Sequence, residues 1–300
     1  MFAPTGIIAA VITPFNKDES LNEAALREHV RSLLNSRVTG LFVVGTGGEF
    51  WALTKDEKKR VFEITVDEAN GKKPVYAGTG VESTGEALEL TKMAKDIGVD
   101  AVSIITPYFV SPTRQGLFEH YSTIAGKVDL PIVLYNNPGR AGGVNLEPSL
   151  VRELAENHSN IVGIKDSSGD LRITTEYIRL CDKINVLAGA DGLIFASLLC
   201  GSKGAIAVTA NVLPNLVADI YECVMKGEIQ KALKAQRELV PLRQAVDRVG
   251  PYPLAIKEAL NMMGRPVGPC RKPIIPATQE RREELKRILL SYEALRSIVK

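Results

Sequence analysis

Eight short apolar runs recur along the 300-residue chain, and they restrict its fold more than any other feature. Most are rich in Val and Ile and are apolar at successive positions. This pattern is typical of parallel strands buried on both faces, whereas a half-exposed strand would alternate apolar and polar residues. The runs occupy residues 7–12, 40–44, 75–77, 101–105, 132–135, 161–164, 185–187 and 205–208.

Segments with helical periodicity separate these runs. Thr54 and Glu57 have the spacing of a capping box, in which each side chain bonds the other residue's backbone N–H at a helix start. Ser83 and Glu86 repeat the pattern before the next helix, and Gly98 stands where that helix should end. The chain therefore alternates strands and helices.

Eight strand–helix units over residues 1–225 predict a (β/α)8 TIM barrel. A doubly wound sheet is the alternative, but the units stop at eight and no dinucleotide-binding loop opens the chain. Beyond residue 226 the strand pattern ends, and helices are expected over 228–249, 253–263 and 278–298. We therefore expect a catalytic barrel over 1–225 and a C-terminal three-helix extension over 226–300.

Charge and composition exclude several classes of partner. The net charge is only +2, with 37 basic and 35 acidic residues interspersed, so no nucleic-acid partner is expected. No apolar run reaches the roughly 18 residues that span a bilayer, so no membrane partner is expected. The four cysteines form no C-x-x-C pair, which favours reduced thiols in a cytoplasmic protein. The three histidines are far apart, so no metal site is expected.

In a barrel of this kind, functional side chains come from the carboxyl ends of the strands. Lys165 follows four apolar positions, and a partly desolvated amine there could act as a nucleophile toward carbonyls. The alternative is a structural lysine whose amine reaches solvent or pairs with Asp166. Tyr135 ends the preceding strand and could move protons or merely plug the barrel mouth. Arg140 follows in a Pro-Gly turn and could clamp a carboxylate or lie in solvent. The loop 45–49 is glycine-rich but lacks the Lys of a P-loop, and its N–H groups could grip a carboxylate.

Three motifs at three predicted strand ends share an order and spacing with one known family. They read Gly45-Thr46-Gly47-Gly48-Glu49, Tyr135-Asn136-x-Pro138-x-Arg140-x-Gly142 and Gly163-Ile164-Lys165-Asp166-Ser167-x-Gly169. Over residues 6–276 the chain resembles the dihydrodipicolinate synthase / N-acetylneuraminate lyase family. The resemblance implies a (β/α)8 barrel with a helical extension, a lysine Schiff base with pyruvate or another 2-oxo acid, and a homotetramer built as a dimer of dimers.

The same resemblance implies roles for individual residues. Lys165 corresponds to the Schiff-base lysine, Tyr135 to the general acid/base, and Thr46 to the hydroxyl of the carboxylate-binding, proton-relay loop. The remaining positions are substrate-binding: Arg140 for the carboxylate of aspartate semialdehyde, Ile206 and Gly189 in the pocket wall, and Gly47 in the carboxylate-binding loop. No external cofactor is implied, because the substrate itself becomes the covalent Schiff base.

Two positions depart from the synthase pattern. Dihydrodipicolinate synthases usually have a second Thr where this chain has Gly47, and a second Tyr, given across a dimer interface, where it has Phe109. Arg140 favours condensation of pyruvate with aspartate semialdehyde, and hence lysine biosynthesis. Gly47 and Phe109 favour a 4-hydroxy-2-oxoglutarate or 2-keto-3-deoxy sugar-acid aldolase. A non-catalytic barrel that binds 2-oxo acids is the alternative of another class.

Overall fold

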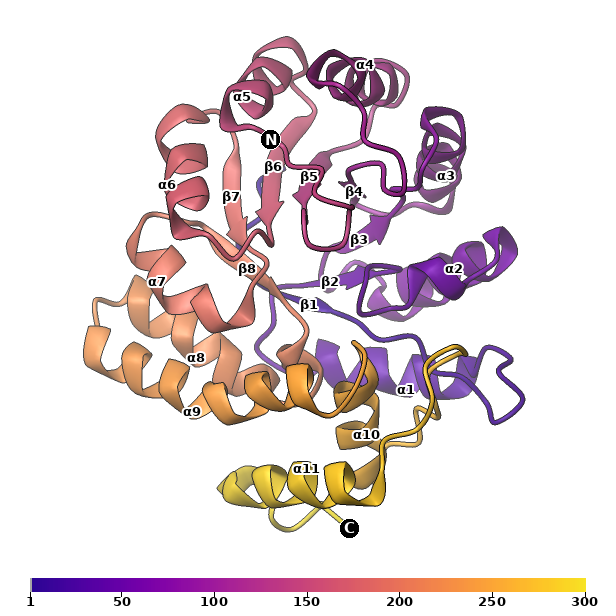
Figure 1. Cartoon of the computed structure of the whole chain (residues 1–300), viewed down its shortest axis with the longest axis vertical. Coiled ribbons are helices and arrows are strands. Elements are labelled where there is room, and N and C mark those ends of the chain that lie inside the picture. Colours follow the sequence, from indigo (N-terminus) through magenta and orange to yellow (C-terminus); the bar gives the residue numbers. More distant parts are fainter. Residues whose placement is uncertain (1) are drawn as a thin grey trace.

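The computed structural model describes residues 2–300 and shows a closed barrel of eight parallel strands in the order β1 to β8 (Figure 1). Pairing of β1 with β8 closes the sheet and rules out the doubly wound alternative, so the predicted TIM barrel is confirmed. The strands are β1 Gly6–Ala10, β2 Gly40–Val43, β3 Val75–Gly78, β4 Ala101–Ile105, β5 Ile132–Asn136, β6 Ile161–Asp166, β7 Asn185–Ala188 and β8 Gly204–Ala207.

Helices alternate with the strands and cover the outside of the barrel (Figure 1). Nearly every strand residue is therefore buried, between the barrel interior and a helix, which is why the runs are apolar throughout. The covering helices are α1 Glu23–Leu34, α2 Lys55–Ala69, α3 Thr84–Ile97, α4 Arg114–Ala125, α5 Pro148–Asn157, α6 Leu171–Leu180, α7 Ile194–Leu199 and α8 Pro214–Met225.

The predicted helix signals act as expected, with one difference. Thr54 and Glu57 form the complete capping box of α2, and Gly98 ends α3 with a φ of 94°, which glycine adopts without strain. Ser83 caps α3 by accepting a bond from the backbone N–H of Glu86, but the reciprocal bond of a capping box is not formed.

Three further α-helices follow α8 (orange to yellow in Figure 1), and α11 packs against the other two. They are α9 Ile229–Arg248, α10 Leu254–Met262 and α11 Gln279–Ser291. Because α9 packs along α8, the chain runs from barrel to extension without an extended linker. The domain boundary at residue 225 stays a prediction.

The expected helix over 278–298 is wrong beyond Ser291, because Tyr292 leaves the helical conformation. Its hydroxyl donates to the carbonyl of Glu238 and accepts from the N–H of Leu242, two groups that an unbroken α9 would pair with each other. Pro241 lies between them inside α9 and disturbs that ladder. Tyr292 therefore bonds the α9 backbone on either side of Pro241, and α11 ends just before it.

One detail of strand pairing positions the site. The register of β5 against β6 shifts by one residue after Ile132. Beyond the shift Tyr135 lies beside Lys165, whereas the unshifted register would place Ile164 there. Since neighbouring residues of a strand point to opposite faces, this bulge places the side chains of Tyr135 and Lys165 together in the barrel interior.

Candidate active site

Lys165 and Tyr135 meet at the carboxyl end of the barrel. The Lys165 amine lies 4.1 Å from the centre of the Tyr135 ring and 5.0 Å from that of Phe42. Both functional side chains are only 4% exposed. Asp166 points to the other face of β6, where its carboxylate accepts a bond from Thr174 at 2.7 Å. The alternative in which Asp166 pairs with Lys165 is therefore wrong, and the lysine amine faces the interior.

The Tyr135 hydroxyl is surrounded by polar groups. Asn137 donates a hydrogen bond to it at 2.8 Å, and the Thr46 hydroxyl lies 3.4 Å away. Burial alone would raise the pKa of Tyr135, but the Lys165 ammonium and the bonds from Thr46, Asn137 and Ser167 together bring that pKa below its ordinary value of 10. The lowered pKa makes it easier for the Tyr135 phenol to release a proton near the amine.

A cavity of about 170 Å³ opens above these side chains. Six of the seven sequence-predicted residues line it: Thr46, Tyr135, Arg140, Lys165, Gly189 and Ile206. Gly47 does not line it, although its position is adjacent: a Cβ at Gly47 would stand 3.1 Å from the hydroxyl of Tyr252, which does line the cavity. Arg140 stands at the mouth, with its guanidinium carbon 5.5 Å from the centre of the Tyr252 ring.

The loop that carries Thr46 is fixed from two sides. Thr13 donates to the carbonyl of Gly48 at 2.7 Å. Glu49, fully buried, pairs with the equally buried Lys257 of α10 at 2.5 Å. Glu49 also accepts a bond at 2.9 Å from the backbone N–H of Arg271. The loop of the candidate site is thus anchored to the C-terminal extension.

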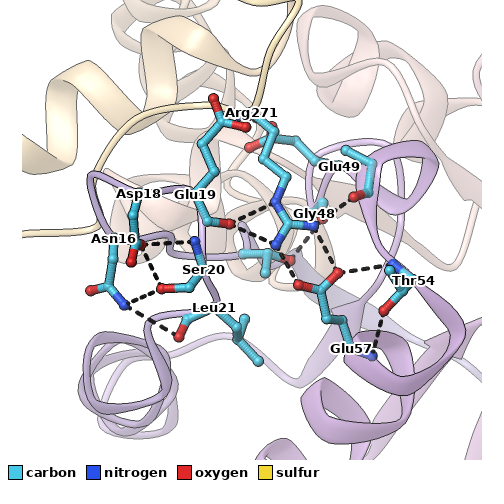
Figure 2. A network of polar contacts seen from close by, with 12 residues as sticks. Asn16, Asp18, Glu19, Ser20, Leu21, Gly48, Glu49, Thr54, Glu57 and Arg271 are labelled. Carbon is cyan, nitrogen blue, oxygen red and sulfur yellow. Dashed lines mark hydrogen bonds and ion pairs between the residues drawn. The ribbon is translucent and has the colours of Figure 1, made fainter.

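Arg271 extends this anchor (Figure 2). Its guanidinium reaches the carboxylate of Glu57 on α2 and the carbonyls of Glu19 and Ala52, and it lies over the ring of Phe15 at 4.3 Å. One arginine therefore ties the extension to the loops that follow β1 and β2. The sequence motifs do not indicate this role.

Comparison with known proteins shows which family this barrel belongs to. The sequence model of the Dihydrodipicolinate synthetase family matches residues 3–291. The chain belongs to this family. It is 43% identical over 290 residues to the 4-hydroxy-tetrahydrodipicolinate synthase of Methanopyrus kandleri, covering 96% of each chain. It is 40% identical to the enzyme of the same name from Methanocaldococcus jannaschii, covering 95% of this chain and 97% of that one.

Solved structures of the family have the same fold. The dihydrodipicolinate synthase of Aquifex aeolicus superposes with a TM-score of 0.94 at 32% identity, covering 99% of both chains. That of Thermotoga maritima gives a TM-score of 0.92 at 34% identity, covering 96% of this chain and 98% of that one. The helical extension is thus part of the shared architecture, because these matches include nearly the whole chain.

Phe109, one of the two positions that depart from the synthase pattern, does not line the cavity. Phe109 is 96% exposed and has a φ of +71°, a conformation that bulky residues rarely adopt. Tyr108 packs edge-on against Phe50 with the ring centres 5.7 Å apart. Neither Tyr108 nor Phe109 lines the cavity of its own chain.

Sequence reasoning missed several cavity residues. Asn137 and Ser167 could have been found, because each lies two positions after Tyr135 or Lys165 and so on the same side of its strand. Asp191 begins the turn after β7; burial raises the pKa of its carboxyl, although two bonds from Thr209 oppose that effect. Three further polar lining residues come from the extension and gave no sequence signal: Arg243, Asp247 and Tyr252.

Proposed function

We propose that the chain is a class I carbon–carbon lyase that joins pyruvate to an aldehyde, with aspartate semialdehyde as the acceptor. One observation carries the proposal: a lysine amine stands in a small cavity against a tyrosine whose phenol is bonded by Thr46 and Asn137. The names of the relatives support the same reaction, and a role in lysine biosynthesis follows from it.

The steps follow from the chemistry of a lysine Schiff base. The Lys165 amine adds to the ketone carbon of pyruvate, and loss of water leaves an iminium. The iminium draws electrons from the adjacent methyl carbon, which releases a proton and becomes the nucleophilic carbon of an enamine. That carbon then bonds to the aldehyde carbon, whose oxygen takes up a proton. Water hydrolyses the iminium that forms again, which releases the product and restores the Lys165 amine. The iminium is the electron sink, so no external cofactor is required.

Each neighbouring group has a proposed task in these steps. Tyr135 moves the protons, because its hydroxyl is close to the amine and its pKa is below the ordinary value. Thr46 holds the Tyr135 hydroxyl, and the N–H groups of its loop receive the pyruvate carboxylate. Arg140 at the mouth receives the carboxylate of the acceptor. Ile206 and Gly189 form the wall of the cavity.

Borohydride reduction in the presence of pyruvate tests the lysine assignment. It should trap a covalent adduct on Lys165, and Lys165→Ala should trap none. Lys58→Ala is a matched control, because Lys58 is also buried but does not line the cavity. Equal trapping by Lys165→Ala would contradict the assignment.

A second candidate function is cleavage of 4-hydroxy-2-oxoglutarate or a 2-keto-3-deoxy sugar acid. The observation that favours it is the set of polar side chains that line the cavity, where Asp191, Asp247 and Arg243 could bind hydroxyl groups. Assays of condensation with aspartate semialdehyde, run beside retro-aldol assays on these acids, decide between the two. Absence of turnover with the semialdehyde would refute the synthase assignment. An adduct without turnover on any aldehyde would indicate a non-catalytic binding barrel.

We also propose a homotetramer, assembled as a dimer of dimers, in the cytoplasm. Three large apolar side chains on the loops after β2 and β4 support association: Trp51 is 42%, Val110 51% and Phe109 96% exposed. Light scattering should give the mass of four chains, and Phe109→Asp should lower it. A monomer at micromolar concentration would refute the assembly.

No helix within residues 2–300 is both long and apolar enough to cross a membrane.

A further inference from the structure

Tyr252 lies in the turn between α9 and α10, and this turn brings it from the extension over the barrel mouth. A Cβ at Gly47 would stand 3.1 Å from the Tyr252 hydroxyl and 3.2 Å from a methyl of Val208. Such contacts are tighter than nine in ten real Cβ contacts, so a neighbour would have to move by a few tenths of an ångström, and a longer side chain would need still more room. Glycine at position 47 therefore leaves the space that the Tyr252 hydroxyl takes.

The Tyr252 hydroxyl is available to bind a ligand. Within residues 2–300 no protein group forms a hydrogen bond with it, and burial together with the nearby Asp191 and Tyr135 raises its pKa well above the ordinary value. It is thus a neutral donor that borders the cavity. The charge of Arg140 over its ring holds the aromatic group in place.

The position of this donor separates it from the groups that handle pyruvate. Lys165 and Tyr135 are at the base of the cavity, and Thr46 bonds to Tyr135. Tyr252 instead comes from the extension and stacks with Arg140 at the mouth, so it faces the side from which the second substrate must enter.

We propose that Tyr252 is a substrate-binding residue that donates a hydrogen bond to the carbonyl oxygen of the acceptor aldehyde, beside an anionic group of the same acceptor held by Arg140. This inference rests on the proposed function and defines its second substrate as a small anionic aldehyde. As the enamine carbon bonds to the aldehyde carbon, the carbonyl π electrons move onto the oxygen. A donor already in place binds that developing charge more strongly than it binds the neutral aldehyde.

Tyr252→Phe tests the inference because it removes only the hydroxyl. We expect kcat/KM for the aldehyde to fall by about 10²-fold, the loss typical of one such donor. The KM for pyruvate and the yield of the borohydride-trapped adduct should not change. Tyr292→Phe is the matched control, since its hydroxyl also belongs to the extension but bonds only α9. Aldehyde kinetics within twofold of the parent would overturn the inference, as would an equal loss of the pyruvate adduct.

A second pair of variants tests the fit between the two positions. Gly47→Ala should reduce aldehyde turnover in the parent, because its methyl displaces the Tyr252 hydroxyl, and should cost little more in the Tyr252→Phe background. Additive losses would contradict the fit. The two hypotheses fail differently: a parent that forms no adduct on Lys165 refutes the proposed function, whereas an adduct-forming enzyme indifferent to Tyr252→Phe refutes only the role of Tyr252.

Discussion

Lys257→Met should destabilise the protein far more than the loss of a surface ion pair. Lys257 is 1% and Glu49 0% exposed, and their charges are 2.5 Å apart. Burial lowers the pKa of Lys257, and the Glu49 carboxylate opposes that effect, so the pair holds both charges in a dry site. Methionine fills a similar volume but leaves the carboxylate without its counter-charge.

The magnitude follows from this geometry. At 2.5 Å and an effective dielectric constant near 20, the attraction is about 7 kcal/mol. Desolvation of the two ions costs several kcal/mol each, so the net contribution of the intact pair is small. Removing one partner forfeits the attraction while the other charge stays buried, and this costs about 3–5 kcal/mol. For a chain of this size that corresponds to a fall in Tm of about 5–8 °C.

Thermal unfolding at one fixed protein concentration measures the effect. Glu49→Gln combined with Lys257→Met should regain most of the loss, because neither charge is then left alone and Gln can still accept the bond from Arg271. Lys55→Met is the control, since the Lys55–Glu89 pair is 54% and 65% exposed and should leave Tm unchanged. The reasoning is refuted if Lys257→Met melts with the parent, or if the double variant melts below the single one.

Three further outcomes are expected. Replacing Asn137 with Leu removes a hydrogen bond to the Tyr135 hydroxyl and should raise the pKa of Tyr135. The alkaline limb of the profile of kcat against pH should then move to higher pH; an unchanged limb would show that Tyr135 does not determine it. Burial holds the pKa of His29 at about 4, below its ordinary 6.5, so the unfolded chain binds more protons between these values. Stability should therefore fall by up to roughly 3 kcal/mol as pH drops through that window, and His29→Gln should flatten the curve of Tm against pH. Gly189→Ala should reduce turnover at least tenfold, because its Cβ would stand 2.1 Å from the Ser167 hydroxyl; a variant with parental kinetics would show that Ser167 moves freely.

The barrel was predictable because each of its units is local. A buried parallel strand needs a short apolar run, and the covering helix needs caps and a periodic face; both can be seen within about 30 residues. The error lies at the end of α11, where Tyr292 leaves the helix and its hydroxyl bonds the distant backbone of α9. No local pattern around Tyr292 could indicate that its hydroxyl bonds the backbone of another helix.

The same division applies to the cavity. Lys165 and Tyr135 were predicted to be neighbours because the ends of adjacent parallel strands meet at one edge of the sheet. Tyr252 could not be predicted in this way, because its position depends on how the extension packs on the barrel. That packing involves long-range contacts such as the ion pair of Lys257 with Glu49. The groups proposed to handle pyruvate thus come from the barrel strands and their loops, whereas Tyr252 comes from the extension.

The bulge between β5 and β6 shows how far strand identity alone determines the site. Had the two strands kept the register that begins at Ile132, the neighbour of Tyr135 would have been Ile164, whose side chain points away from Lys165. Both strands would still be apolar and buried, so the sequence pattern would not differ. The chemistry proposed here therefore depends on an inserted residue in one strand, and any substitution that removes the shift should separate amine and phenol while leaving the barrel closed.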